Sequence, residues 1–415
     1  MSRRELARPP NSLAQHFEAP ENFRGVFGWV CGYSADAHFL DNAVERFTRN
    51  SRAQRAFEGR ISLAMMLDPG NPYLSIVDVP GVAHLPLKSA RDRPFRLLHA
   101  KVALLGFRHE TVADVWQLRL IVSTGNWTRG TLEDSLDLVW RIDLASTELD
   151  QGSASTEYSE VDQRCTDFER VRNFLRWIAG HFDQRILVTA PPKQDAVGST
   201  TSRDLLDGWL FEASKYAKAA PPRFMDNRHE SFLSQLPSRV MSVAGKAKRN
   251  YLALGSGFFE GATLSEVPPS VLIAIAQVLK DNDLLTTNPN ADVFVNPVAC
   301  QSVATSVNAL AKAGFSVRDA GQPEYFGKSH QRQLHAKFIF SANRRANSPA
   351  CGNSWIYLGS GNLTGPGFTQ KASANGGNLE AGVILAPDYI HWCAANDVAA
   401  EHVLTNVLPV QWTQT

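Results

Sequence analysis

A three-residue motif that occurs twice constrains the fold of this 415-residue chain more than any other feature. His-Ala-Lys stands at His99–Lys101 and again at His335–Lys337, and an asparagine follows each histidine by 27 residues, at Asn126 and Asn362. The repetition of both the motif and the spacing predicts an internal duplication in which the two halves carry the same chemistry.

Both motifs lie in apolar stretches with the alternation that is typical of β-strands. Side chains two residues apart in an extended chain point to the same side, so each histidine should share a face with its lysine. Each asparagine ends a second β-like run, at a turn that contains Ser and Gly. We therefore expect the two histidines, two lysines and two asparagines to meet in one cleft between halves related by a pseudo-twofold axis.

These residue types suit chemistry at a phosphodiester. Lysine and asparagine donate to the non-bridging oxygens, and two imidazoles supply a nucleophile on one side and an acid for the leaving oxygen on the other. The sequence near the motifs has no cysteine cluster, carboxylate-rich tract or His-Glu-x-x-His motif. A metal is then unnecessary, because the lysines supply the positive charge. The prediction is a phosphate site that uses neither metal nor cofactor.

The chain resembles the phospholipase D superfamily, whose motif is His-x-Lys, four residues and then Asp, followed by an asparagine in a Gly-Ser-rich turn. Gly106 and Ala342 stand where the aspartates would be. The absence of both resembles the tyrosyl-DNA phosphodiesterase branch. Residues 378–383, Asn-Leu-Glu-Ala-Gly-Val, are similar to the strand of that branch that carries a carboxylate, which implies Glu380 for this role. In the first half Asp137 takes the equivalent place, where that branch has a glutamine.

The resemblance implies a division of labour at this site. His99 would attack phosphorus and form a covalent phosphohistidine, and His335 would protonate the leaving phenolate and later activate water. Glu380 and Asp137 would orient the two imidazoles. The charge of the five-coordinate transition state would be held by Lys101, Lys337, Asn126 and Asn362. The substrate would be a DNA 3′ end, single-stranded or frayed, that carries a tyrosyl or similar adduct.

Four further residues are candidates for substrate binding. Ser256 lies in a loop similar to the Gly-Ser-Leu-Gly loop of the family and could offer its hydroxyl to an anion. Lys328 and Arg332 belong to a basic patch just before the second motif. Trp127 follows Asn126 directly, and either stacks on a base or an aromatic leaving group or packs in the core.

Similar patterns of strands and helices precede both motifs. The fold class predicted is α/β, with two pseudo-twofold related halves, each a mixed sheet flanked by helices, and one shared active-site cleft. We expect the halves at residues 1–190 and 203–415. The expected elements are strands at 25–33, 59–67, 251–254, 293–296 and 314–318, and helices at 34–50, 159–182, 268–280 and 302–313.

Composition limits the partners. The net charge is +1, so the chain lacks the global basic field of proteins that coat nucleic acid, and binding to DNA would have to be local. Its 5 cysteines are scattered without Cys-x-x-Cys spacing, which favours reduced thiols inside a cell. The N-terminus has no apolar signal core, and no apolar run reaches membrane-spanning length. A cytoplasmic or nuclear protein without a membrane partner is expected.

Two alternative activities keep the same site. One is a nuclease of the same superfamily that cleaves ordinary DNA phosphodiesters in defence or restriction. The other is a phospholipid-cleaving enzyme, which the absence of an amphipathic membrane helix disfavours. A catalytically inactive binding module would have lost one of the histidines or lysines, and all four are present.

Overall fold

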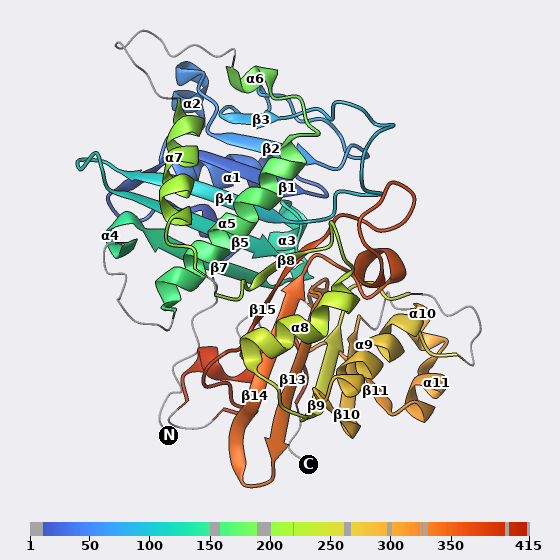
Figure 1. Cartoon of the computed structure of the whole chain (residues 1–415). Helices are drawn as coiled ribbons and strands as arrows, with labels where there is room; N and C mark the ends of the chain where they lie inside the picture. The colour runs from blue at the N-terminus through green and yellow to red at the C-terminus, as the bar shows by residue number, and fades with distance from the viewer. Residues whose placement is uncertain are drawn as a thin grey trace.

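Two mixed β-sheets, each with helices packed on it, make up the protein (Figure 1). The computed structural model describes residues 11–149, 158–188, 201–218, 220–260, 267–296, 301–323, 326, 331–394 and 398–412. The 6-stranded first sheet has the order β3 (Val82–His84), β2 (Leu63–Leu67), β1 (Phe23–Gly32), β4 (Val102–His109), β5 (Trp116–Ser123), β7 (Val139–Ala145). The 7-stranded second sheet has the order β11 (Phe315–Asp319), β10 (Leu285–Val295), β9 (Arg249–Gly255), β13 (Phe338–Arg345), β14 (Ser348–Gly359), β15 (Ala381–Leu385), β8 (Phe224–Asp226).

The two sheets share one topology. In the first, β3, β2 and β1 pair in parallel and the pairs from β1 to β7 are antiparallel. In the second, β11, β10 and β9 pair in parallel and the pairs from β9 to β15 are antiparallel. Strand β8 then adds an antiparallel edge that the first sheet does not match. The predicted fold class, two related α/β halves with mixed sheets, is confirmed.

Helices pack on the sheets because each helix has one apolar face that is buried against a sheet. The first half carries α1 (Ala37–Thr48), α2 (Arg52–Glu58), α5 (Glu160–Ala179) and α7 (Ser202–Ser214), and the second carries α8 (Phe232–Ala244), α9 (Ser270–Asp281), α10 (Gln301–Ala304) and α11 (Val307–Lys312). Figure 1 shows α5 and α7 side by side across the first sheet. Two separate hydrophobic cores lie against the first sheet: one contains residues of α1, and the other contains residues of α5 and α7. The first sheet is therefore buried on both faces. None of the helices in the described ranges is long and apolar enough to cross a membrane.

The sequence patterns predicted most of the expected helices correctly, and one prediction was wrong. Asp36 accepts a hydrogen bond from the Phe39 N–H at 2.7 Å and caps α1. The single helix expected over residues 302–313 is wrong, because the segment divides into α10 and α11. Between them, the Ser306 hydroxyl donates to the Val303 carbonyl, a local bond that competes with helix continuation.

The packing of α7 bears on where the two halves divide. Helix α7 begins at Ser202, next to the start of the expected second half, yet Leu206, Leu210 and Ala213 pack into the core of the first sheet. The next strand, β8, pairs with β15 in the second sheet. The burial of α7 therefore assigns it to the first half, and we propose a division between Ser214 and Phe224.

Candidate active site

Each histidine-lysine motif lies in an extended segment that leads into a central strand. His99 and Lys101 directly precede β4, and His335 and Lys337 directly precede β13, so the motifs stand just outside the strands. The asparagines follow β5 and β14, the neighbours of β4 and β13, after three residues. The predicted convergence at strand ends therefore arises twice, at equivalent places in the two sheets.

The two halves are joined by backbone pairing at the motifs themselves. The N–H groups of His99 and Ala100 both donate to the Leu379 carbonyl, at 2.9 and 2.8 Å. In the same way, the N–H groups of His335 and Ala336 donate to the Leu136 carbonyl at 3.1 and 2.7 Å. Just before the second motif, β12 (Gln333–Leu334) pairs with β6 (Ser135–Leu136) of the other half. Each motif is thus fixed by the half to which it does not belong.

This pairing gives each histidine a carboxylate from the opposite half. Leu379 and Leu136 immediately precede Glu380 and Asp137. His99 Nδ1 lies 2.9 Å from Glu380 Oε2, and His335 Nδ1 lies 2.9 Å from Asp137 Oδ1. A carboxylate accepts, so Nδ1 of each imidazole carries the hydrogen and donates it. Nε2 of each ring then keeps its lone pair, which is the form that a nucleophile or a general base needs.

Each lysine reaches the Nε2 atom of its own histidine. Lys101 Nζ lies 3.0 Å from His99 Nε2, and Lys337 Nζ lies 3.1 Å from His335 Nε2. Both lysines are 0% exposed, as is Glu380. The result is a pair of buried Lys–His–carboxylate chains, one from each half.

Burial changes the ionisation of these groups. Desolvation lowers the pKa of His99 to about 4, even though the nearby Glu380 carboxylate raises it. Desolvation and the positive charge of Lys337 lower the pKa of Lys101 to about 7. Desolvation alone lowers the pKa of Lys337 to about 8. The pKa of His335 is also lowered by burial. At neutral pH the His99 imidazole is therefore uncharged, and the lysines are close to losing their protons.

Glu380 is held more firmly than Asp137. Burial raises the pKa of the Glu380 carboxyl, but His99, Lys101 and Ser360 together bring it below its ordinary value. The Ser360 hydroxyl donates to Oε2, and Asn378 Nδ2 donates to Oε1 at 3.2 Å. Asp137 accepts from the Thr124 hydroxyl at 2.8 Å through Oδ1. Its other oxygen, Oδ2, is buried without a partner in the described part of the chain.

Both asparagines border the same site. Asn126 and Asn362 are half-buried, and Asn126 Oδ1 is among the buried side-chain atoms that have no hydrogen-bond partner in the described residues. Lys337 of the second half donates to the Thr124 carbonyl, two residues before Asn126, at 3.2 Å. Each lysine also lowers the pKa of the histidine in the other half: Lys337 lowers that of His99, and Lys101 lowers that of His335. The two histidines and two lysines thus form one constellation, and the turns that carry the asparagines lie beside it. Such a set can hold a phosphoryl oxygen between ammonium and amide donors.

Solved structures share this arrangement of sheets. The yeast tyrosyl-DNA phosphodiesterase superposes with a TM-score of 0.50 over 89% of this chain and 85% of its own, at 10% identity. A mutant form of the same yeast enzyme gives a TM-score of 0.51 over 90% and 86% of the two chains, also at 10% identity. The chain has the tyrosyl-DNA phosphodiesterase fold. No family model matches the sequence, and no curated protein sequence matches it. The similarity to tyrosyl-DNA phosphodiesterase therefore rests on the fold.

Two of the expected substrate-binding residues have structural roles in this tyrosyl-DNA phosphodiesterase fold. Trp127 is 0% exposed, packs against Phe17 and Phe39, and donates from Nε1 to the Cys31 carbonyl at 2.9 Å. Of the two alternatives expected for Trp127, the structure shows packing in the core of the first half and not stacking on a substrate. Ser256 is also 0% exposed, and its hydroxyl donates to the Phe258 carbonyl and accepts from the Leu363 N–H, so it joins its own loop to the turn of Asn362.

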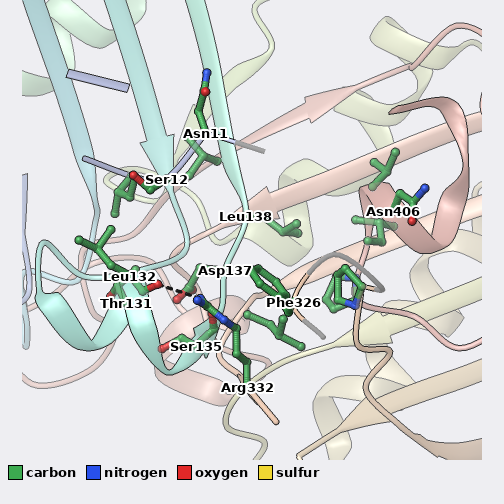
Figure 2. A pocket seen from close by; sticks show the side chains of 17 residues that line it. Asn11, Ser12, Thr131, Leu132, Ser135, Asp137, Leu138, Phe326, Arg332 and Asn406 are labelled. Atoms are coloured by element: carbon green, nitrogen blue, oxygen red, sulfur yellow. Dashed lines mark hydrogen bonds between the residues drawn. The ribbon is translucent and has the colours of Figure 1, made fainter. Parts of the chain in front are cut away.

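The basic patch before the second motif is corrected as well. Lys328 lies outside the described residues. The Arg332 guanidinium lies 4.0 Å from the centre of the Phe326 ring and donates to the carbonyls of Leu132 at 2.9 Å and Ser135 at 3.3 Å. Figure 2 shows the Arg332 side chain pointing toward these first-half residues. It lies beside a cavity of about 190 Å³ that is lined by residues of both halves, including Asp137. Because its donors are used between the halves, Arg332 acts as a structural link.

A tyrosine that the sequence did not single out covers one histidine. The ring of Tyr33, in the turn after β1, lies with its centre 5.5 Å from that of the His99 imidazole. Tyr33 is far in sequence from both His-Ala-Lys motifs. Only its place in the turn after β1 could have indicated from the sequence that it lies at the site. In the described ranges, no group of three or more His, Cys, Asp or Glu residues could hold a metal ion.

Proposed function

We propose that this protein is a metal-independent phosphodiesterase that removes tyrosyl or similar adducts from DNA 3′ ends through a covalent phosphohistidine. The observation that carries the proposal is the pair of buried Lys–His–carboxylate chains that meet where the two halves join. Two imidazoles, each with a lysine ammonium group at its Nε2 atom, suit the displacement of a leaving group from a phosphodiester.

The reaction has two steps in which each histidine has one task at a time. His99 Nε2 attacks phosphorus, and the bond between phosphorus and the tyrosyl oxygen breaks. The bound phosphate anion raises the pKa of His335, so His335 Nε2 takes up a proton when substrate binds and passes it to the departing phenolate. Water then attacks phosphorus, the bond to His99 breaks, and His335 accepts the proton of that water. The products are free tyrosine, or its peptide, and a DNA 3′-phosphate. Lys101 and Lys337 neutralise the non-bridging oxygens in both steps.

The electrostatics support His99 as the nucleophile. A nucleophilic imidazole must be uncharged, and the pKa of about 4 leaves His99 neutral at any physiological pH. Glu380, with its bonds from Ser360 and Asn378, fixes the ring. His335 has the more exposed side chain, 23% against 11%, which suits a residue that exchanges protons with the leaving group and with water.

The pH dependence of kcat/KM follows from these pKa values. A lysine carries its charge below its pKa, so Lys101 and Lys337 lose their charges as the pH rises through about 7 and about 8. His99 becomes protonated only as the pH falls through about 4. With a 4-nitrophenyl ester, which needs no acid, we expect kcat/KM to be highest between about 4 and 7 and to decline above that range. The anionic substrate raises the lysine pKa values when bound, so the decline in kcat should come at higher pH. A kcat/KM that keeps rising above pH 8 would contradict this account.

Chelation and substrate choice test the proposal itself. With EDTA present, the protein should release tyrosine from 3′-phosphotyrosyl DNA at the untreated rate, because the lysines take the place of a metal. The same preparation is compared on 5′-phosphotyrosyl DNA, an unmodified oligonucleotide and a phospholipid. Faster cleavage of the unmodified oligonucleotide would point to the nuclease alternative. Loss of all activity in EDTA, with recovery on addition of magnesium or manganese, would overturn the mechanism.

A further inference from the structure

The turns that follow β1 and β9 occupy equivalent places beside the two histidines. In the first half, a β-bridge joins Ala35 to Trp127, the residue after Asn126. In the second half, a β-bridge joins Phe259 to Leu363, the residue after Asn362. Both bridges are parallel, and in each of them the partner residue directly follows the motif asparagine, so the two turns can be compared residue by residue.

This comparison reveals an asymmetry at the histidines. Two residues before its bridge, the first turn has Tyr33, whose ring packs on His99. The second turn has Gly257 at that position. A Cβ atom on Gly257 would lie 3.1 Å from His335 Cα and 3.0 Å from the Leu334 carbonyl oxygen, so no side chain fits without a shift. The backbone of Gly257 therefore lies against His335 where a tyrosine covers His99, and His335 has the more exposed side chain.

The residue after this glycine, Phe258, has an aromatic side chain that is exposed to solvent. Phe258 is 58% exposed, whereas its neighbours Ser256 and Phe259 are buried. The buried Ser256 hydroxyl fixes the backbone of Phe258, because it donates to the Phe258 carbonyl at 2.6 Å and lies 3.3 Å from the Phe258 N–H. It also lies 3.2 Å from the Leu363 N–H, which ties the loop to the asparagine turn. The backbone of Phe258 is thus fixed next to Gly257, which lies against His335, and the Phe258 side chain is exposed.

We propose that Phe258 is a specificity-determining residue that stacks on the aromatic ring of a phenolic leaving group. The inference rests on the proposed function, in which displacement in line with His99 places the leaving oxygen next to His335. The group attached to this oxygen then departs on the side where Gly257 leaves His335 uncovered. Aromatic pairs favour contact between rings beyond the area that they bury, so a phenol gains more from Phe258 than an aliphatic alcohol does.

The test compares two leaving groups on one oligonucleotide. One 3′-phosphodiester carries a phenol, and the other carries a fluorinated aliphatic alcohol of similar acidity, so that chemistry at phosphorus is matched. The readout is the ratio of kcat/KM for the two esters, measured in EDTA. Phe258→Leu keeps an apolar side chain but removes the ring, and should lower this ratio about five- to tenfold. Phe258→Trp should retain it. Phe211→Leu is the control, because Phe211 is 54% exposed and lies on α7 of the first half.

The possible outcomes separate this inference from the function on which it rests. A ratio that is the same in Phe258→Leu, Phe211→Leu and the wild type would overturn the role of Phe258 and leave the proposed function standing. An equal fall for both esters would also overturn it, since Phe258 would then contact the DNA strand. Absence of cleavage of both esters by the wild-type protein would overturn the proposed function, and the inference with it.

Discussion

His99→Ala should abolish turnover of 3′-phosphotyrosyl DNA, by about 10⁴-fold or more, and should also abolish any covalent protein–DNA adduct. The reason is that His99 provides the atom that bonds to phosphorus before any other bond breaks. His99→Gln should behave in the same way, because its amide has no comparable lone pair. Product formation and adducts on a denaturing gel are the measurements. The control is His38→Ala, which changes an exposed histidine on α1.

The loss must not come from unfolding. Without the imidazole, Glu380 still accepts hydrogen bonds from Ser360 and Asn378, so both His99 variants should keep a cooperative thermal transition. An adduct that still forms in His99→Ala, with His335→Ala free of adduct, would show that the two histidines have the opposite roles.

His335→Ala should accumulate the adduct that His99→Ala lacks. A tyrosine phenol has a pKa of about 10 and leaves with modest help, whereas release of the histidine requires an activated water. Loss of His335 should therefore slow the second step more than the first, by about 10²- to 10⁴-fold for a lost general base. The adduct is measured by denaturing gel against the wild type.

The same variant distinguishes the class of substrate. The sugar hydroxyl of an ordinary phosphodiester is a much poorer leaving group than a phenol, so its departure depends on the acid. On such a substrate, loss of His335 should block the first step, and no adduct should appear. Trapping on both substrates side by side thus tests the roles of the histidines and the leaving group together.

The part of the site that could be predicted from sequence is the part that is local. A histidine and a lysine two residues apart lie on the same side of an extended segment, and this does not depend on the rest of the chain. The equal spacing from each histidine to its asparagine indicates two equivalent pairs of strands. The same duplication predicted two related sheets, and the strand orders agree with it. The break within the helix expected over residues 302–313 was missed because apolar periodicity does not detect a serine that bonds back to its own turn.

The remaining features depend on contacts between distant segments. The exchange of carboxylates between halves arises from backbone pairing at Leu136 and Leu379, which no periodicity reveals. Trp127 stands in a turn beside a motif residue, yet the cores of α1 and β1 enclose it. Arg332 is positively charged and adjacent to the motif, but carbonyl groups of the first half take up its donors. In these cases tertiary packing decided the role of a side chain whose sequence context suggested another.

The most direct test of a shared site with a phosphohistidine is to map the adduct. His335→Ala is incubated with 3′-phosphotyrosyl oligonucleotide in EDTA and quenched, and the protein is digested and analysed by mass spectrometry under alkaline conditions that preserve a phosphorus–nitrogen bond. The account predicts a modified peptide that contains His99, with the phosphate on the imidazole. Modification at a serine, tyrosine or carboxylate, or turnover by the wild type with no trapped phosphohistidine in either protein, would contradict it.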